Sequence, residues 1–120
     1  MNVLRDRLVN KGKDAVMFDI DNTLIFTNGR ANVPVIQLLH ECKRLGYIVV
    51  IMTARPMIPG MLQMTKYQLY TYGIPYDHLY ITPAENKGNL KRQTGYRYIL
   101  SVGDMDTDLT DTDYIIKISI

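Results

Sequence analysis

Hydrophobic residues follow two patterns that alternate along the chain. Short, continuous apolar runs are typical of strands buried on both faces of a sheet. Such runs occupy residues 15–20, 47–52, 78–82, 98–102 and 114–118. Helices are predicted between them, over residues 33–45, from 59 or 60 to about 72, and 85–93. This alternation predicts an α/β domain with a parallel sheet of about five strands and helices on both faces.

Each of the two longer predicted helices has an apolar face and ends at a glycine. In the first helix, the face consists of Val35, Leu38, Leu39, Cys42 and Leu45, followed by Gly46. In the second helix, it consists of Ile58, Met61, Leu62, Leu69 and Tyr72, followed by Gly73. We expect both faces to pack against the sheet, because an amphipathic helix buries its apolar side.

Composition and charge narrow the class of protein. The 120 residues suffice for one domain over 1–120 with a core of its own. The 14 Lys and Arg against 12 Asp and Glu give a net charge of +2, which does not favour a nucleic-acid or membrane surface. No apolar run approaches the roughly 20 residues of a membrane span, and the first residues do not form a signal peptide, so we expect a cytoplasmic protein. One cysteine and two widely spaced histidines do not favour a disulfide or a zinc centre.

Acidic residues follow two of the predicted strands. Asp19 and Asp21 come at the end of the first strand, two positions apart, so their carboxylates can face one cavity. Asp104 and Asp108 follow the fourth strand directly after Gly103, which permits a tight turn. Carboxylates this close together repel, and a divalent cation is the usual partner that offsets the repulsion.

Groups suited to binding phosphate follow the second and third predicted strands. Thr53, Ala54 and Arg55 offer a hydroxyl and a guanidinium at the end of the second strand. Lys87 lies near the start of the last helix, where its ammonium can reach a phosphate or the first carboxylate. Lys91 shares that helix face, but Lys87 is nearer the strand ends, so we expect Lys91 in solvent or beside the approach to the site. Ligand sites of parallel sheets lie at the carboxyl ends of the strands, and all these residues are placed there.

In chain order, these residues form four motifs. They are Asp19-x-Asp21-x-Thr23, Thr53, Lys87 and Gly103-Asp104-x-x-x-Asp108. The ordered set resembles the four motifs of the haloacid dehalogenase-like (HAD) phosphohydrolase superfamily, and the resemblance covers residues 15–118. The first and last motifs also look like those of class B acid phosphatases and related nucleotidases. The resemblance implies a three-layer, Rossmann-like fold.

The resemblance also implies a role for each motif residue. Asp19 would be the nucleophile that takes the phosphoryl group as an aspartyl-phosphate, and Asp21 the general acid and base. Mg²⁺ would be held by Asp19, the main-chain carbonyl of Asp21 and the carboxylate of Asp104. Asp108 would orient the metal site. Thr53, together with Ala54, Arg55 and Lys87, would bind the phosphoryl oxygens.

Asp21 and the spacing between elements distinguish among reactions of this superfamily. A second aspartate two residues after the nucleophile favours phosphate-ester hydrolysis over dehalogenation, because only the ester's leaving oxygen needs a proton. About a dozen residues separate Asp21 from the first long helix, and five positions separate Thr82 from Lys87. Neither connection is long enough for a cap domain. We expect residues 24–29 to form a small flap beside the site, where Phe26 and Asn28 could touch a substrate.

The sequence therefore predicts a capless, Mg²⁺-dependent phosphomonoester hydrolase. Its expected partner is a phosphorylated substrate, either a nucleotide or a phosphorylated nucleic-acid end, with nucleic acid entering only as substrate. A phosphoprotein or sugar-phosphate phosphatase and a non-catalytic phosphate-binding module are the alternatives. The chain could be a monomer or a homo-oligomer.

Two other classes share part of the acidic pattern. Asp104-x-Asp106-x-Asp108 looks like the start of an EF-hand loop, but Leu109 and Ile115 stand where that loop needs glycine and a carboxylate. A response-regulator receiver would need its acceptor aspartate at the end of the third strand, where this chain has Thr82.

The remaining aromatic and titratable residues are interpreted mainly as structural. Five tyrosines fall in one stretch, Tyr67, Tyr70, Tyr72, Tyr76 and Tyr80. They favour packing or a dimer face over the stacking of nucleic-acid bases. His40 and His78 are expected at the surface or rim, and Cys42 in the core.

Overall fold

The chain folds around one five-stranded sheet whose strands all run parallel. The structure, a computed structural model, describes residues 2–119. The strands are β1 (Asp14–Phe18), β2 (Ile48–Thr53), β3 (His78–Ile81), β4 (Arg97–Gly103) and β5 (Tyr114–Lys117). They lie in the order β3-β2-β1-β4-β5, so β1 is central and its neighbours are β2 and β4. The predicted α/β class and parallel five-stranded sheet are confirmed.

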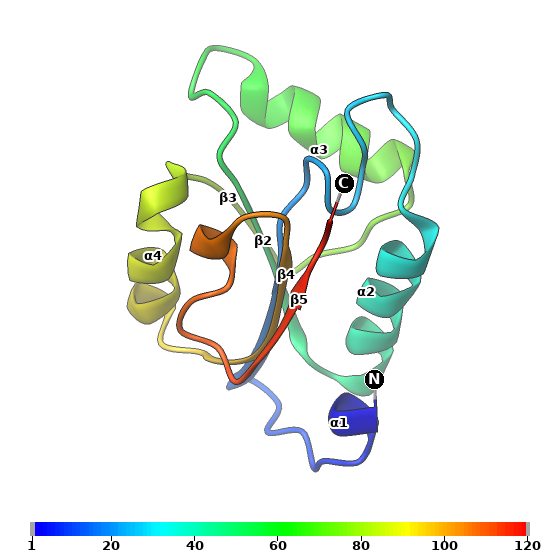
Figure 1. Cartoon of the computed structure of the whole chain (residues 1–120), viewed down its shortest axis with the longest axis vertical. Helices are drawn as coiled ribbons and strands as arrows, with labels where there is room; N and C mark the ends of the chain where they lie inside the picture. The colour runs from blue at the N-terminus through cyan, green and yellow to red at the C-terminus, as the bar shows by residue number, and fades with distance from the viewer. Residues whose placement is uncertain (1, 120) are drawn as a thin grey trace.

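Helices cover both faces of the sheet. The helices are α1 (Asn2–Arg5), α2 (Val33–Leu45), α3 (Met61–Thr71) and α4 (Lys87–Thr94), and the 3₁₀ turns are η1 (Ala84–Asn86) and η2 (Asp106–Asp108). Figure 1 shows the sheet nearly edge-on, with α2 and α4 on opposite sides of it. Val16 and Phe18 of β1 join the core cluster on the α2 side, and Ala15 and Met17 join the cluster that Leu90 of α4 contacts. This alternation along one strand produces the three layers.

The helix boundaries follow the sequence closely, whereas the orientation of α3 does not. The structure has α2 over Val33–Leu45, as predicted, and Gly46 ends it in the left-handed conformation. Of the predicted apolar face, however, Ile58 precedes α3 and is 57% exposed, and Leu62 is 39% exposed; the buried residues of α3 are Thr65 and Leu69. In Figure 1, α3 runs across the end of the sheet, so only a narrow part of its surface contacts the core. The prediction that its whole apolar face packs on the sheet is wrong.

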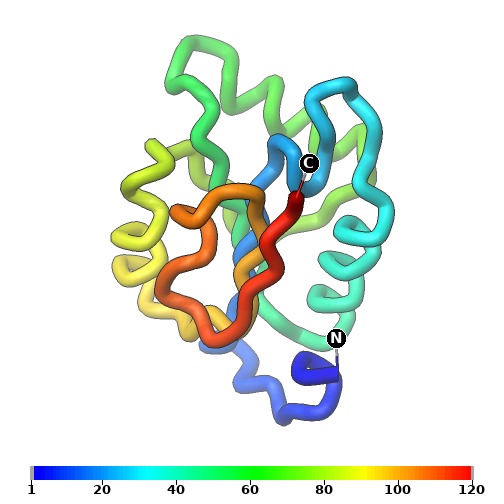
Figure 2. The backbone as a smooth tube through the Cα atoms, viewed as in Figure 1, coloured from blue at the N-terminus to red at the C-terminus, as the bar shows by residue number. Residues whose placement is uncertain are grey.

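The parallel register places the carboxyl ends of β1, β2 and β4 side by side. Phe18 pairs with Ile51 of β2 and with Val102 of β4. The next residue, Asp19, donates its backbone N–H to the carbonyl of Val102 at 3.0 Å. Figure 2 shows the segments that follow β1 and β4 meeting at this end of the sheet. Among the described residues, no helix is long and apolar enough to cross a membrane.

Candidate active site

Three aspartates meet where β1 and β4 end. Asp19, Asp104 and Asp108 each offer a carboxylate oxygen, and these oxygens lie within 4.8 Å of one another. Asp19 extends β1, whereas Asp104 and Asp108 lie on the turn that leaves β4 through η2. The geometry therefore brings together acids that are 85 or more positions apart in the sequence (19 to 104).

Gly103 allows this close approach because it has no side chain. A Cβ at this position would lie 2.3 Å from both Cβ and Oδ2 of Asp108. The sequence suggested that the glycine permits a tight turn, but Gly103 is not among the glycines with positive φ. Its importance is the space it leaves for the Asp108 side chain.

Lys87 joins two of the three carboxylates. Its Nζ donates to Asp19 Oδ1 at 3.1 Å and to Asp108 Oδ1 at 2.5 Å, and the residue is 2% exposed. When the three aspartates are ionised, one ammonium leaves two negative charges uncompensated, which matches the charge of a divalent cation. Carboxylate oxygens are the ligands that Mg²⁺ prefers, so this donor set fits the metal.

Burial and the neighbouring charges shift the pKa values of both groups in this ion pair. Desolvation raises the pKa of Asp19 to about 7, although the charge of Lys87 opposes the shift. Desolvation also acts to lower the pKa of Lys87, but the charges of Asp19 and Asp108 outweigh it and raise that pKa above its usual value. Lys87 therefore stays an ammonium beside Asp19.

Lys91 is also buried, contrary to the expectation that it lies in solvent. It is 1% exposed and donates to Ser101 Oγ at 2.9 Å, to the Asp108 carbonyl at 2.6 Å and to the Thr110 carbonyl at 2.7 Å. Burial lowers its pKa to about 8. The expectation was wrong because the shared face of α4 points at η2, so both lysines reach that turn.

Thr53 is a buried group without a protein partner. It ends β2, is 1% exposed, and no described residue hydrogen bonds to its Oγ1. A buried hydroxyl left without a partner costs about 1–3 kcal/mol. Thr53 lines the cavity that Asp19 also lines, where a ligand oxygen could accept a hydrogen bond from this hydroxyl.

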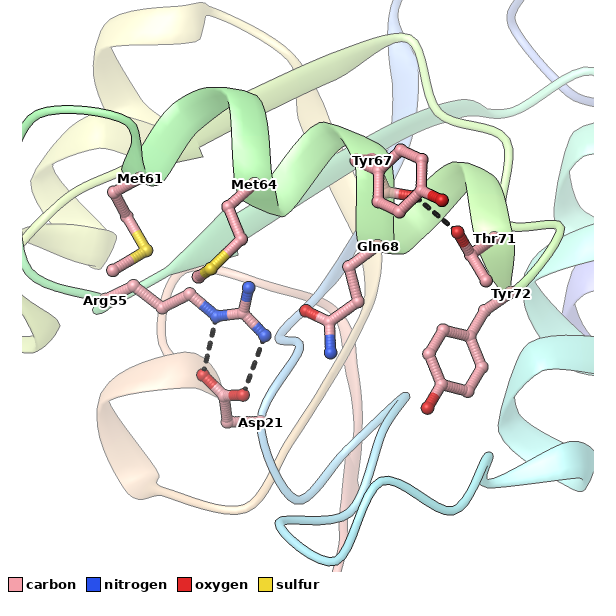
Figure 3. Close-up of a pocket in the computed structure, with 8 residues that line it drawn as sticks. All are labelled: Asp21, Arg55, Met61, Met64, Tyr67, Gln68, Thr71 and Tyr72. Carbon is pink, nitrogen blue, oxygen red and sulfur yellow. Dashed lines mark hydrogen bonds and ion pairs between the residues drawn. The ribbon is translucent and has the colours of Figure 1, made fainter.

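Asp21 and Arg55 form a two-point ion pair that the sequence did not indicate. Arg55 Nε lies 3.0 Å from Asp21 Oδ2, and Nη2 lies 2.9 Å from Oδ1 (Figure 3). Arg55 Nη1 also donates to Thr65 Oγ1 of α3 at 3.2 Å. The Arg55 side chain is 10% exposed, and that of Asp21 is 49% exposed. The guanidinium thus holds the Asp21 carboxylate while both remain at the cavity.

One cavity of about 300 Å³ collects most of the predicted site residues. Its lining consists of Asp19, Asp21, Asn22, Thr53, Ala54, Arg55, Pro56, Lys87, Asp104 and Met105. Asp108 does not line it and is bound behind it by Lys87. Phe26 and Asn28 of the predicted flap do not line it either.

Sequence reasoning missed three features of this site. Asn22 has a φ of +62°, a left-handed conformation that turns the chain directly after Asp21; asparagine tolerates it better than most residues, which was an available signal. The contact of Lys91 with η2 had a weaker signal, its four-residue spacing from Lys87. Nothing local indicated the Arg55–Asp21 pair, because its members are 34 positions apart.

The fold and the site together define an α/β domain with an acidic, lysine-bridged centre at the carboxyl ends of its middle strands. The chain belongs to the haloacid dehalogenase-like hydrolase family, whose sequence model matches residues 16–109. No curated protein sequence matches the chain.

Two solved structures contain chains of similar fold. They are described as the Pnkp1/Rnl/Hen1 complex and the Pnkp1/Rnl/Hen1 RNA repair complex, with TM-scores of 0.67 and 0.68 and 20% sequence identity in each case. The similarity covers 93% of this chain but only 48% and 45% of those chains. At this identity the likeness shows the fold alone, and the present chain spans less than half the length of either relative.

Proposed function

We propose that this hydrolase is a Mg²⁺-dependent phosphomonoesterase that acts through an aspartyl-phosphate on Asp19. The observation that carries the proposal is the pairing of Lys87 with Asp19 at 3.1 Å, beside the unpartnered Thr53 hydroxyl in the same cavity. A phosphoryl group in this cavity would find a nucleophile, a fixed positive charge and a free hydroxyl donor.

The metal would be held by Asp19, Asp104 and the main-chain carbonyl of Asp21, with Asp108 orienting the site. The three carboxylates support this assignment because their oxygens lie within 4.8 Å of one another. Bound Mg²⁺ would reduce the repulsion between the anionic nucleophile and the anionic ester.

In the first step, an oxygen of Asp19 would form a bond to phosphorus while the bond from phosphorus to the ester oxygen breaks. Asp21, in its protonated form, would give its proton to that leaving oxygen. In the second step, Asp21 would take a proton from water as the water oxygen attacks phosphorus. The Asp19–phosphorus bond then breaks and inorganic phosphate leaves. Thr53 and Lys87 would hold the phosphoryl oxygens in both steps.

Arg55 has a different role in this proposal from the phosphate contact that the sequence suggested. Its two bonds to Asp21 would hold the ionised carboxylate at the cavity, where it takes a proton from water in the second step, which makes Arg55 a positioning residue.

We propose that the substrate is a nucleotide or a phosphorylated nucleic-acid end, which binds at a site without a cap domain. The fold shared with a chain of an RNA repair complex supports this choice, although that activity belongs to the other protein. The alternatives are a phosphoprotein or sugar-phosphate phosphatase and a non-catalytic phosphate-binding module.

The test is phosphate release from p-nitrophenyl phosphate, with Mg²⁺ and with a chelator. Asp19→Asn should lower the rate at least about a thousandfold while leaving the fold intact, because an amide is a poor nucleophile of similar shape. The matched control is Asp106→Asn, an exposed acid on the same turn that pairs with Lys117 and does not belong to the acidic cluster. Wild-type activity in Asp19→Asn would remove the mechanism. No release by folded wild-type protein would overturn the hydrolase proposal and favour the binding module.

A further inference from the structure

A second, larger cavity lies along α3 next to the proposed active site. Its volume is about 510 Å³, within the range of sites that hold small organic ligands. Figure 3 shows Met61 and Met64 directed toward it from α3, with Gln68 between them and Tyr72. Tyr67 also belongs to its lining.

This cavity is continuous with the active site through Asp21 and Arg55, which line both. The proposed function makes Asp21 the proton donor to the leaving oxygen. The leaving group of the ester must therefore extend from the phosphoryl cavity past Asp21, and the cavity along α3 begins there.

We propose that the α3 cavity binds the nucleoside part of a nucleoside monophosphate whose phosphate occupies the active site. This inference rests on the proposed function and adds the residues that recognise the substrate. The phosphate would lie near Lys87 and Thr53, and the base would contact Met64, Tyr67 and Gln68.

The lining has the chemistry that a nucleobase requires. Tyrosine rings stack on heterocycles, and thioethers pack readily against aromatic faces. The Gln68 amide offers one acceptor and two donors, which match the mixed donors and acceptors at the edge of a base. Within residues 2–119 that amide has no recorded hydrogen-bond partner, and Figure 3 draws none.

The exposure of these side chains also needs an explanation. Met64 is 53% exposed and Tyr67 is 72% exposed, although large apolar groups gathered at one place are usually covered by a partner or ligand. Packing and dimer formation were the expected roles of the tyrosines. Tyr67 does not pack in the core, and its place at the rim of this cavity favours contact with a substrate.

The same lining fits the rival substrates less well. A sugar phosphate would need several hydrogen-bonding groups. The Thr71 hydroxyl already donates to the carbonyl of Tyr67 and the Tyr72 hydroxyl to that of Gly29, so the Gln68 amide and the Tyr67 hydroxyl are the polar groups that α3 offers it. A phosphotyrosine ring would use the apolar surface, but its edge would leave the Gln68 amide without a partner.

The experiment compares adenosine 5′- and 3′-monophosphate with glycerol 2-phosphate, which has no base. Tyr67→Ala and Gln68→Ala should each lower kcat/KM for whichever nucleotide the wild type hydrolyses better. This loss should be about tenfold larger than the loss in kcat/KM for glycerol 2-phosphate. The control is Tyr70→Ala, an 82% exposed tyrosine on the same helix that lines a different cavity with His40, and it should change neither value. Equal losses for the two kinds of substrate, or no loss in either variant, would overturn the inference.

A binding measurement separates this inference from the proposed function. Calorimetric titration of Asp19→Asn with the same nucleotides needs no turnover, and Tyr67→Ala in that background should weaken binding about tenfold. Binding with this dependence but no hydrolysis by the wild type would overturn the proposed function alone. Hydrolysis of glycerol phosphate that needs Asp19, without a base effect, would overturn the inference alone.

A short oligonucleotide with the same terminal phosphate identifies the source of the nucleoside. If the α3 cavity accepts a base, either the mononucleotide or the oligonucleotide end must outperform glycerol phosphate, and the ratio of their kcat/KM values shows which one is preferred. If neither does, the inference fails.

Discussion

At the scale of single residues, two lysines of one helix face have different partners. Lys87 binds the side chains of Asp19 and Asp108, whereas Lys91 binds carbonyl oxygens and Ser101. The first contact reaches the reacting carboxylate, and the second fixes the turn behind it. Their proximity in sequence therefore does not make them equivalent.

Substitution of each lysine should separate activity from stability. Lys87→Ala should lower the phosphatase rate of the folded protein about a hundredfold or more, because it removes the charge beside Asp19. Lys91→Ala should reduce the free energy of unfolding by about 3 kcal/mol, because three acceptors lose their donor and two of them are buried. Urea unfolding and rates per folded molecule measure both effects. The control is Arg92→Ala, which changes the exposed neighbour of Lys91. Its free energy of unfolding should stay within about 0.5 kcal/mol of the wild-type value. A larger activity loss in folded Lys91→Ala than in Lys87→Ala would show that the roles are reversed.

The thiol of Cys42 should be unreactive in the folded protein. Cys42 is fully buried on α2, as expected, and burial raises its pKa to about 12. The thiolate is the reactive form, and in urea the pKa of the thiol returns to about 8.5. Raising the pH from 7 to 9 should therefore speed alkylation by iodoacetamide in urea but not in native buffer. Mass spectrometry of the alkylated fraction measures this difference. Equal rates with and without urea would contradict the burial of Cys42.

At the scale of elements, the junction between β4 and η2 sets the position of the acids. Asp104 precedes η2 and Asp108 is its last residue, and the Asp108 side chain fits against the bare Cα of Gly103. The backbone N–H of Met105 also donates to Asp108 Oδ2 at 3.2 Å. Both contacts tie the buried carboxylate to the strand end.

Gly103→Ala should disrupt this junction. A Cβ would lie 2.3 Å from Asp108, so the carboxylate must move; we expect a loss of about 3 kcal/mol in the free energy of unfolding and a loss of activity. Gly12→Ala is the control, because a Cβ at this position would have no atom within 4 Å. The only cost is that of placing alanine at a φ of +83°. That cost is about 1–2 kcal/mol, and activity should remain. Urea unfolding and the phosphatase assay test both variants; equal effects on activity would show that Gly103 does not position Asp108.

At the scale of the whole molecule, the parallel sheet concentrates negative charge at one end. Segments that follow β1 and β4 supply three carboxylates, and α4 supplies the ammonium that Asp19 and Asp108 share. A cation that binds only this assembled arrangement stabilises the folded state by mass action.

Mg²⁺ should therefore raise the melting temperature. At a concentration about 100 times its Kd, the expected stabilisation is about 2.7 kcal/mol, or several degrees for a domain of this size. Asp104→Ala should abolish the shift, whereas Asp106→Ala should keep it, because only Asp104 belongs to the cluster. Calorimetry with and without Mg²⁺ measures the shift without any substrate. An unchanged metal titration in Asp104→Ala would place the metal elsewhere.

Three features could be predicted from the sequence alone: the strands, the bounds of α2, and the placement of Asp19, Thr53 and Asp104 at strand ends. These features follow from local periodicity and from a general property of parallel sheets, whose carboxyl ends meet at one edge. Neighbouring residues and the order of the strands are therefore enough to predict them.

Three other features depend on tertiary packing: the burial of Lys91, the pairing of Arg55 with Asp21 and the exposure of the outer face of α3. Each depends on how an element is placed relative to a distant segment, as in the 34 positions between Arg55 and Asp21. Helical spacing identifies which residues share a face but not what that face meets. The packing of α3 across the end of the sheet and of α4 on its face set those partners, and α3 and α4 each contribute to the lining of one of the two adjoining cavities.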